Sequence, residues 1–160
     1  MAIKIGDTLP AGKFKTMGDS GPQELTTAQL FGGKRVLLVS VPGAFTPTCN
    51  AKHLPGYIAQ ADELKRHGVD TIACMAVNDV HVMSAWGRAS GAEGKVLMLA
   101  DGSGDYVRAL GLEVDLSAAG MGWRGRRFAL LADNGVVEQL SIENPGEFKV
   151  SGADAMLCQL

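Results

Sequence analysis

Hydrophobic residues in this chain form short apolar runs that alternate with stretches of helical spacing. Residues 33–42 (GKRVLLVSVP) are a continuous apolar run after a glycine pair, which is typical of a buried strand that ends at Pro42. Over residues 46–66 the apolar spacing changes to three and four, which predicts a helix. Pro55 is expected to kink or split that helix, and Gly68 to end it.

The same alternation continues toward the C-terminus. The pattern predicts strands over 69–77 and 95–101 and helices over 80–89 and 104–111. Asn78 and Asp79 offer an N-cap for the first of these helices, and Gly111 closes the second.

The last part of the chain gives the clearest local signal. Residues 115–126 are glycine-rich and aperiodic and are predicted to be a loop. Residues 127–142 hold two β runs around Asn134-Gly135, the residue pair of a type I′ hairpin. An S-x-x-D pattern beginning at Ser151 predicts a short C-terminal helix. This element order predicts one α/β domain over residues 1–160, with a central mixed sheet flanked by helices on both faces, as in the thioredoxin-like class.

Composition narrows the function classes. With 160 residues, 46% of them hydrophobic, a net charge of −2 and a pI near 5.9, nothing favours nucleic-acid binding. The start of the chain lacks a signal peptide and no apolar run is long enough to cross a bilayer, so we expect a cytoplasmic protein without membrane contact. His53, His67 and His81 are expected on the surface.

The cysteine pattern favours a free thiol. Cys49, Cys74 and Cys158 are odd in number, widely spaced and without a C-x-x-C pair, so we expect neither a disulfide framework nor a metal site. Cys74 lies in a predicted buried strand and is expected to be inert. Cys158, near the C-terminus, is expected to be a packing residue or an exposed thiol.

Cys49 lies at the start of a helix. With Thr46 as N-cap and Pro47 at N1, Cys49 occupies N3, in the first turn. Backbone N–H groups there lack helical partners and the helix dipole is positive, and both effects favour a thiolate. Pro42 has no N–H to bind water and can limit solvent beside the sulfur. From the residues alone, a simpler interpretation is equally favoured. In that interpretation Thr46 only caps the helix and Pro42 only ends the strand.

The neighbours of Cys49 disfavour three kinds of thiol chemistry. A tyrosine-phosphatase loop needs arginine six residues later, where Pro55 stands, and a dithiol oxidoreductase needs a second cysteine where Lys52 stands. A papain-like mechanism would use His53 as a base, which a thiol activated by a helix end does not need. What remains is oxidation of the thiolate to sulfenic acid.

Three segments carry a resemblance to a known family. The pattern P-x-x-x-T-x-x-C within VPGAFTPTCNAKHLPGY, together with VNDVHVMSAWG (77–87) and RRFALLADNGVV (126–137), resembles the type II, peroxiredoxin-5-like peroxiredoxins. The similarity runs from about residue 6 to residue 160. The resemblance implies a thioredoxin fold, a homodimer, and a peroxidase that reduces hydrogen peroxide and organic hydroperoxides.

The resemblance also implies roles for individual residues. Cys49 would be the peroxidatic cysteine, Thr46 would hydrogen-bond the peroxide and Pro42 would shield the sulfenic acid. The family's pocket arginine, which precedes an aromatic residue, falls on Arg127; the residues alone do not distinguish it from Arg124 or Arg126. Phe45 and Ala44 are apolar neighbours that suit organic hydroperoxides, so Phe45 joins Thr46, Cys49 and Arg127 as a candidate substrate-binding residue.

The reductant follows from a departure from the family pattern. Some type II members carry a resolving cysteine in the C-terminal part, where this chain has Ser151. The resemblance therefore implies a one-cysteine cycle without a resolving cysteine or a bound cofactor, reduced by external glutathione and glutaredoxin or by thioredoxin. The alternatives are a peroxide sensor or redox-linked binding protein that uses the same thiol, and a thioredoxin-fold binding module whose thiol is incidental.

Overall fold

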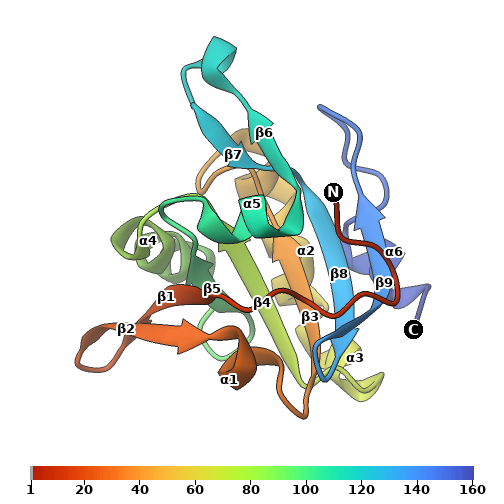
Figure 1. The fold of residues 1–160 in the computed structure, drawn as a ribbon. Helices are drawn as coiled ribbons and strands as arrows, with labels where there is room; N and C mark the ends of the chain where they lie inside the picture. The colour runs from red at the N-terminus through yellow and green to blue at the C-terminus, as the bar shows by residue number, and fades with distance from the viewer. Residues whose placement is uncertain (1) are drawn as a thin grey trace.

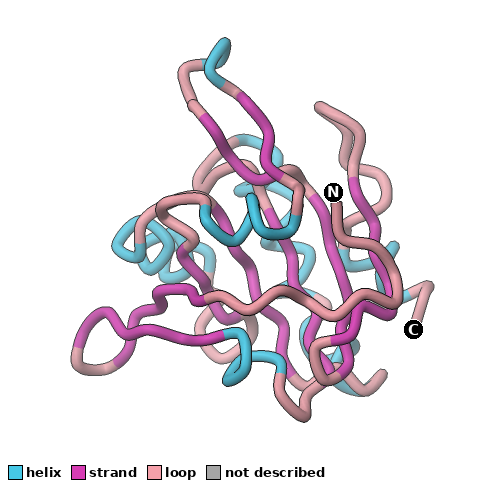
Figure 2. Tube along the Cα trace, viewed as in Figure 1, coloured by secondary structure: helices cyan, strands magenta, loops and turns pink. Residues whose placement is uncertain are grey.

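The computed structural model describes residues 2–160, which contain nine strands and six α-helices (Figures 1 and 2). The strands are β1 (Lys13–Gly18), β2 (Gly21–Thr26), β3 (Arg35–Ser40), β4 (Thr71–Ala76), β5 (Leu97–Ala100), β6 (Glu113–Asp115), β7 (Trp123–Gly125), β8 (Phe128–Asp133) and β9 (Val136–Ile142). The helices are α1 (Thr27–Phe31), α2 (Leu54–Ala59), α3 (Ala61–Arg66), α4 (Val80–Ser90), α5 (Asp105–Leu110) and α6 (Ala153–Leu157), with a π-helical turn η1 (Cys49–His53) and a 3₁₀ turn η2 (Ser117–Ala119).

Seven strands form one mixed sheet in the order β2-β1-β5-β4-β3-β8-β9. β3, β4 and β5 are parallel, while β8 pairs antiparallel with β3 and β9 antiparallel with β8. The sequence explains why β3 is an interior strand: its side chains alternate between two cores, Leu37 and Val39 on one face and Val36 and Leu38 on the other.

Helices cover both faces of this sheet, as predicted. Buried residues of α2, α3, α4 and α6 pack on the face of Leu37 and Val39, together with Cys49. Buried residues of α1 and α5 pack on the opposite face. Cys49, the candidate functional cysteine, therefore lies in the core between the sheet and helices α2, α3, α4 and α6.

Most of the predicted elements are confirmed. β3, β4, β5, α4 and α5 lie inside their predicted ranges or within one residue of them. Asp79 caps α4 through its side chain, which accepts from the Val82 N–H at 2.9 Å. Asn134 and Gly135 both have positive φ, at 48° and 80°, as the hairpin between β8 and β9 requires. Sequence periodicity did not predict β1, β2 or α1.

Two local predictions are wrong, and one is met in part. The helical segment over 46–66 changes from the π-helical η1 to α2 between His53 and Leu54, one residue before Pro55, and it is interrupted again at Gln60, which the sequence did not predict. The segment 115–126 is no simple loop, since β6 and β7 pair across it. Ser151 does not cap α6, because its hydroxyl donates to Glu143.

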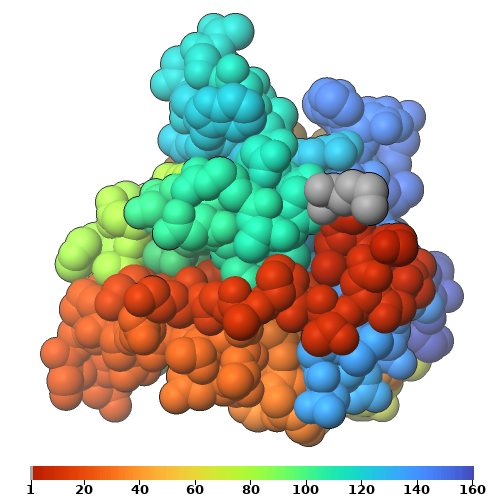
Figure 3. Space-filling model, viewed as in Figure 1, coloured from red at the N-terminus to blue at the C-terminus, as the bar shows by residue number. Residues whose placement is uncertain are grey.

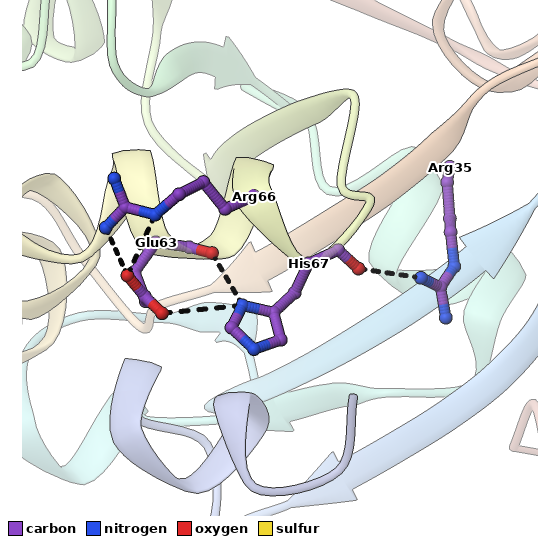
Figure 4. A network of polar contacts seen from close by, with 4 residues as sticks. All are labelled: Arg35, Glu63, Arg66 and His67. Atoms are coloured by element: carbon purple, nitrogen blue, oxygen red, sulfur yellow. Dashed lines mark hydrogen bonds and ion pairs between the residues drawn. The ribbon is translucent and has the colours of Figure 1, made fainter.

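The two ends of the sheet differ in character. At one end, Glu63 pairs with Arg66 and His67, and Arg35 donates to the His67 carbonyl (Figure 4). These are exposed ion pairs, which contribute little stability. At the other end the β6–β7 hairpin projects from the molecule (Figure 3), beside the turn that follows β9. No helix within residues 2–160 is long and apolar enough to cross a membrane.

Candidate active site

A tight turn joins β3 to the helical segment that carries Cys49. The Ala44 N–H donates to Asn78 Oδ1 at 2.9 Å, which ties this turn to the residue before the α4 cap. Phe45 adopts a φ of +64°, an uncommon conformation for a residue with a side chain. Asn78, which follows β4, thus holds the turn in place. A strained backbone such as that of Phe45 is concentrated at functional sites.

Thr46 begins the helix through its backbone. Its carbonyl accepts the first helical bond, from the Asn50 N–H at 2.8 Å, so the N–H groups of Thr48 and Cys49 precede the helical ladder. The predicted side-chain cap is wrong: no helix N–H among the described residues donates to the Thr46 hydroxyl, which itself donates to the Gly43 carbonyl at 2.8 Å. With its proton committed, the Thr46 oxygen is left as an acceptor.

Cys49 is fully buried, and Arg127 reaches it. Arg127 Nη2 lies 3.2 Å from Cys49 Sγ. A guanidinium cannot lose its proton, so a permanent positive charge lies beside the sulfur. The structure therefore brings together two residues that lie 78 positions apart in the sequence.

Strand register decides which of three arginines takes this place. Ser40 at the end of β3 pairs with Phe128 at the start of β8, so Arg127 lies just beyond the end of β3. Arg127 also shares the alternation of Ala129, which faces the core of Cys49, whereas Phe128 faces the other core. Arg124 instead donates to the Pro42 carbonyl at 3.2 Å and fixes the turn from outside.

A buried histidine orients Arg127. Arg127 Nη1 lies 2.9 Å from His53 Nδ1, and because a guanidinium only donates, Nδ1 is the acceptor. The ring therefore carries its proton on Nε2, which donates to the Ser151 carbonyl at 2.9 Å. The expectation of a surface histidine is wrong: His53 has no exposed surface. Burial lowers its pKa from 6.5 to about 4, the Ser151 carbonyl opposes this, and Arg127 adds to it.

The Ser151 carbonyl is itself held in place. It also accepts from the Tyr57 hydroxyl at 2.6 Å. The Glu143 carboxylate accepts from the N–H groups of residues 149–151 and from the Ser151 hydroxyl, at 2.7 to 2.9 Å. Burial opposes ionisation of Glu143, but these hydrogen bonds lower its pKa below the usual value. A chain of contacts thus runs from Glu143 through Ser151 and His53 to Arg127.

Phe45 and Phe148 lie on different sides of this site. The Phe148 ring packs 4.9 Å from the His53 ring and 5.9 Å from the Arg127 guanidinium carbon. Phe45 is 49% exposed and packs on Trp86 with ring centroids 6.3 Å apart. A cavity of about 220 Å³ borders the site, and its lining includes Pro42, Thr48 and Arg127 but not Phe45.

The two other cysteines lie outside this arrangement. Cys74 is buried in β4, where burial, with a further contribution from the nearby Cys49, raises the pKa of its thiol. Cys158 is exposed at the end of α6. Cys74 is the buried residue that the sequence predicts, and Cys158 is the exposed thiol of the two predicted alternatives.

The chain matches the Redoxin family over residues 4–157. This chain belongs to the Redoxin family. Peroxiredoxin-2C from Oryza sativa subsp. japonica is 49% identical over 156 residues, which cover 97% of this chain and 96% of that protein. Reduced Prx3 from Vibrio vulnificus in complex with H2O2 is 48% identical, with a TM-score of 0.95 over 98% of each chain. Peroxiredoxin 5 from Alvinella pompejana is 38% identical, with a TM-score of 0.85 over 98% of this chain and 96% of that one.

Membership in this Redoxin family settles the activity class. The relatives are peroxiredoxins at high identity and nearly full coverage, so this peroxiredoxin is a thiol-dependent peroxidase. The resemblance to peroxiredoxin-5-like proteins and the thioredoxin fold are both confirmed.

Sequence reasoning missed the residues that support the arginine of this peroxiredoxin. His53 follows Cys49 by four positions, which places both on one helical face, but the sequence suggested it only as a base for the thiol and not as a partner of Arg127. Glu143 and Tyr57 gave no local signal, and the local pattern at Ser151 indicated a helix cap, because the contacts of these residues cross 8 to 98 positions of the chain.

The buried His53 predicts an acid-sensitive fold. Its pKa of about 4 in the folded protein lies below the 6.5 of the unfolded chain, so the unfolded state binds more protons between these values. Stability should therefore fall as the pH is lowered through this window, by about 3 kcal/mol in total. His53→Gln should flatten that dependence in urea unfolding measured from neutral pH to about pH 4.

The contribution of His53 to the pH dependence of stability can be distinguished from that of other titrating groups. Glu143 has a lowered pKa, so its contribution is lost only below its unfolded value of 4.5, outside most of the window. His81→Gln, at an exposed position of α4, is the matched control and should leave the curve unchanged. An unaltered slope in His53→Gln would contradict the assignment.

Proposed function

We propose that Cys49 is the peroxidatic cysteine, with Arg127, Thr46 and Pro42 as its active-site partners. The observation that carries this proposal is the 3.2 Å contact between Arg127 Nη2 and Cys49 Sγ inside a buried site. Because this cation is fixed beside the sulfur before the reaction begins, it stabilises negative charge in the transition state without reorganisation.

The remaining groups suit the transfer of one oxygen atom. The thiolate attacks one peroxide oxygen, an S–O bond forms and the O–O bond breaks, and the departing oxygen takes a proton to become water or an alcohol. Negative charge moves from sulfur to the departing oxygen, so N–H donors of Arg127 and of the first helical turn stabilise the transition state. The Thr46 oxygen, whose proton is held by Gly43, is free to accept from the peroxide O–H.

We propose that Pro42 limits access of solvent to the sulfur. It follows buried Val41, and its carbonyl is held by Arg124 at 3.2 Å. Proline offers no N–H to a water molecule. We propose that it shields the sulfenic acid, and that Phe45, half-exposed at the turn, contacts the organic part of larger hydroperoxides.

We propose a one-cysteine cycle with glutathione and glutaredoxin, or thioredoxin, as the external reductant. The position of the resolving cysteine in some relatives is Ser151 here, and Ser151 is buried and bonded to Glu143. Cys74 is buried in the sheet and Cys158 is exposed on a separate helix. The sulfenic acid then reacts with a thiol from outside the chain, and no bound cofactor takes part.

A double variant tests the glutathione cycle. Cys74→Ser/Cys158→Ser, oxidised with one equivalent of peroxide and then mixed with glutathione, should gain one glutathione on Cys49, measured by peptide mass spectrometry. Glutaredoxin should then release it and restore turnover. A protein that consumes one equivalent of peroxide and stops, with every thiol reductant supplied, would support the sensor alternative.

We also propose a homodimer that works in the cytoplasm. Phe45 and Trp123 are 49% and 58% exposed, and aromatic side chains are enriched at protein–protein interfaces. Sedimentation velocity tests the homodimer, because a single species at the mass of one chain would exclude it. Fractionation of cells that produce the protein tests the cytoplasmic location.

A further inference from the structure

A preformed cavity of about 220 Å³ lies near Cys49, at the end of the molecule from which the β6–β7 hairpin projects. Val114 and Leu116 line it from the β6–β7 hairpin, and residues 143–147 line it from the turn after β9. Figure 1 shows both segments rising from the same end of the molecule. Pro42 and Thr48, which flank the cysteine turn, complete the lining with Arg126 and Arg127.

The charge around this cavity is unbalanced. Among residues 2–160, the ion pairs involve none of the three arginines 124, 126 and 127. Arg126 Nη2 donates only to the Glu143 carbonyl, at 3.1 Å.

Glu143 and Glu147 also line the cavity, and the carboxylates of both already have partners within the chain. Glu147 pairs with Lys149 at 2.6 Å. The Glu143 carboxylate is filled by hydrogen bonds from residues 149–151. With Glu147 balanced by Lys149, the lining leaves the two guanidinium groups of Arg126 and Arg127 against the one carboxylate of Glu143. This excess of positive charge suits an anion, and guanidinium groups suit a carboxylate in particular.

We propose that this cavity binds the carboxylate of an anionic thiol reductant, of which glutathione is the example, with Arg126 as the specificity-determining residue. The inference rests on the proposed glutathione cycle and names the site that would select its reductant. The glutathione thiol attacks the Cys49 sulfur, an S–S bond forms and the S–O bond breaks, and hydroxide leaves as water with the thiol proton.

Burial of the sulfur explains why such a site is needed. Cys49 has no exposed surface, so the sulfur has to become exposed before a thiol can reach it. A reductant already held beside it by a carboxylate is present at a high effective concentration when that happens. A neutral thiol of the same size gains no such advantage.

The test compares glutathione with its diethyl ester, in which both carboxylates are masked. Each variant is oxidised with one equivalent of peroxide and mixed with either thiol, and loss of sulfenic acid is followed by stopped flow. The ratio of the glutathione rate to the ester rate should fall about tenfold in Arg126→Gln, as loss of a charge-assisted hydrogen bond predicts. Arg88→Gln, at an exposed position on α4, should keep the wild-type ratio.

Two further measurements make every outcome decisive. Arg126→Lys keeps the charge and should keep most of the ratio, and added salt should lower the ratio in wild type more than in Arg126→Gln. Equal ratios in wild type and Arg126→Gln would overturn the inference while the glutathione cycle stands. If neither thiol reduces the wild-type sulfenic acid, the glutathione cycle falls, and the inference falls with it.

Discussion

Cys49→Ser should reduce peroxide consumption to the level of buffer, with hydrogen peroxide or an organic hydroperoxide as substrate. A serine hydroxyl does not ionise near neutral pH, so Arg127 would face a neutral oxygen that cannot attack the O–O bond. The measurement is steady-state turnover with glutathione and glutaredoxin, and separately with thioredoxin.

The other two cysteines provide matched controls. Cys74→Ser and Cys158→Ser should each keep turnover with at least one reductant, because Cys74 is buried in β4 and Cys158 lies exposed on α6. Loss of turnover in either variant, with Cys49 still oxidised by one equivalent of peroxide, would show that a second cysteine resolves the sulfenic acid. The one-cysteine cycle would then be wrong, although the peroxidatic role of Cys49 would stand.

Arg127→Gln should slow oxidation of Cys49 by peroxide by about 10²–10³, the effect of removing one preorganised donor from a transition state. The glutamine removes the positive charge 3.2 Å from Cys49 Sγ and the donor to His53. Stopped-flow oxidation in a single turnover, without any reductant, measures this step alone. Alkylation of Cys49 by iodoacetamide at neutral pH should slow in parallel, since both reactions need the thiolate.

Conservative and distant substitutions test the geometry. Arg127→Lys keeps the charge but loses the planar fork that reaches Cys49 and His53 together, so it should recover only part of the rate. Arg88→Gln removes an exposed arginine from α4 and should behave as wild type. An Arg127→Gln variant that oxidises at the wild-type rate would disprove the assigned role, and Arg124 or Arg126 would then be the arginine to test.

The local structure around the candidate site could be predicted where the residues concerned are close together in the chain. Pro42, Thr46 and Cys49 lie within eight positions, and their strand-turn-helix context could be inferred from apolar spacing, proline and threonine. Even there, the Thr46 hydroxyl donates to the Gly43 carbonyl in the tight turn. Helix breaks were harder, since the second interruption, at Gln60, has neither a proline nor a glycine to mark it.

The sequence by itself determined the α/β class and the strand that leads to Cys49, and it made Cys49 the candidate for the reactive sulfur. Each of these follows from periodicity or from residues within one turn of each other. Only the tertiary structure decided that Arg127 is the arginine at the sulfur, because the choice depends on the pairing of Ser40 with Phe128 and on which face each side chain of β8 takes. It also decided the support by His53, Ser151 and Glu143, because these hydrogen bonds join segments that meet only once the sheet and its helices are packed.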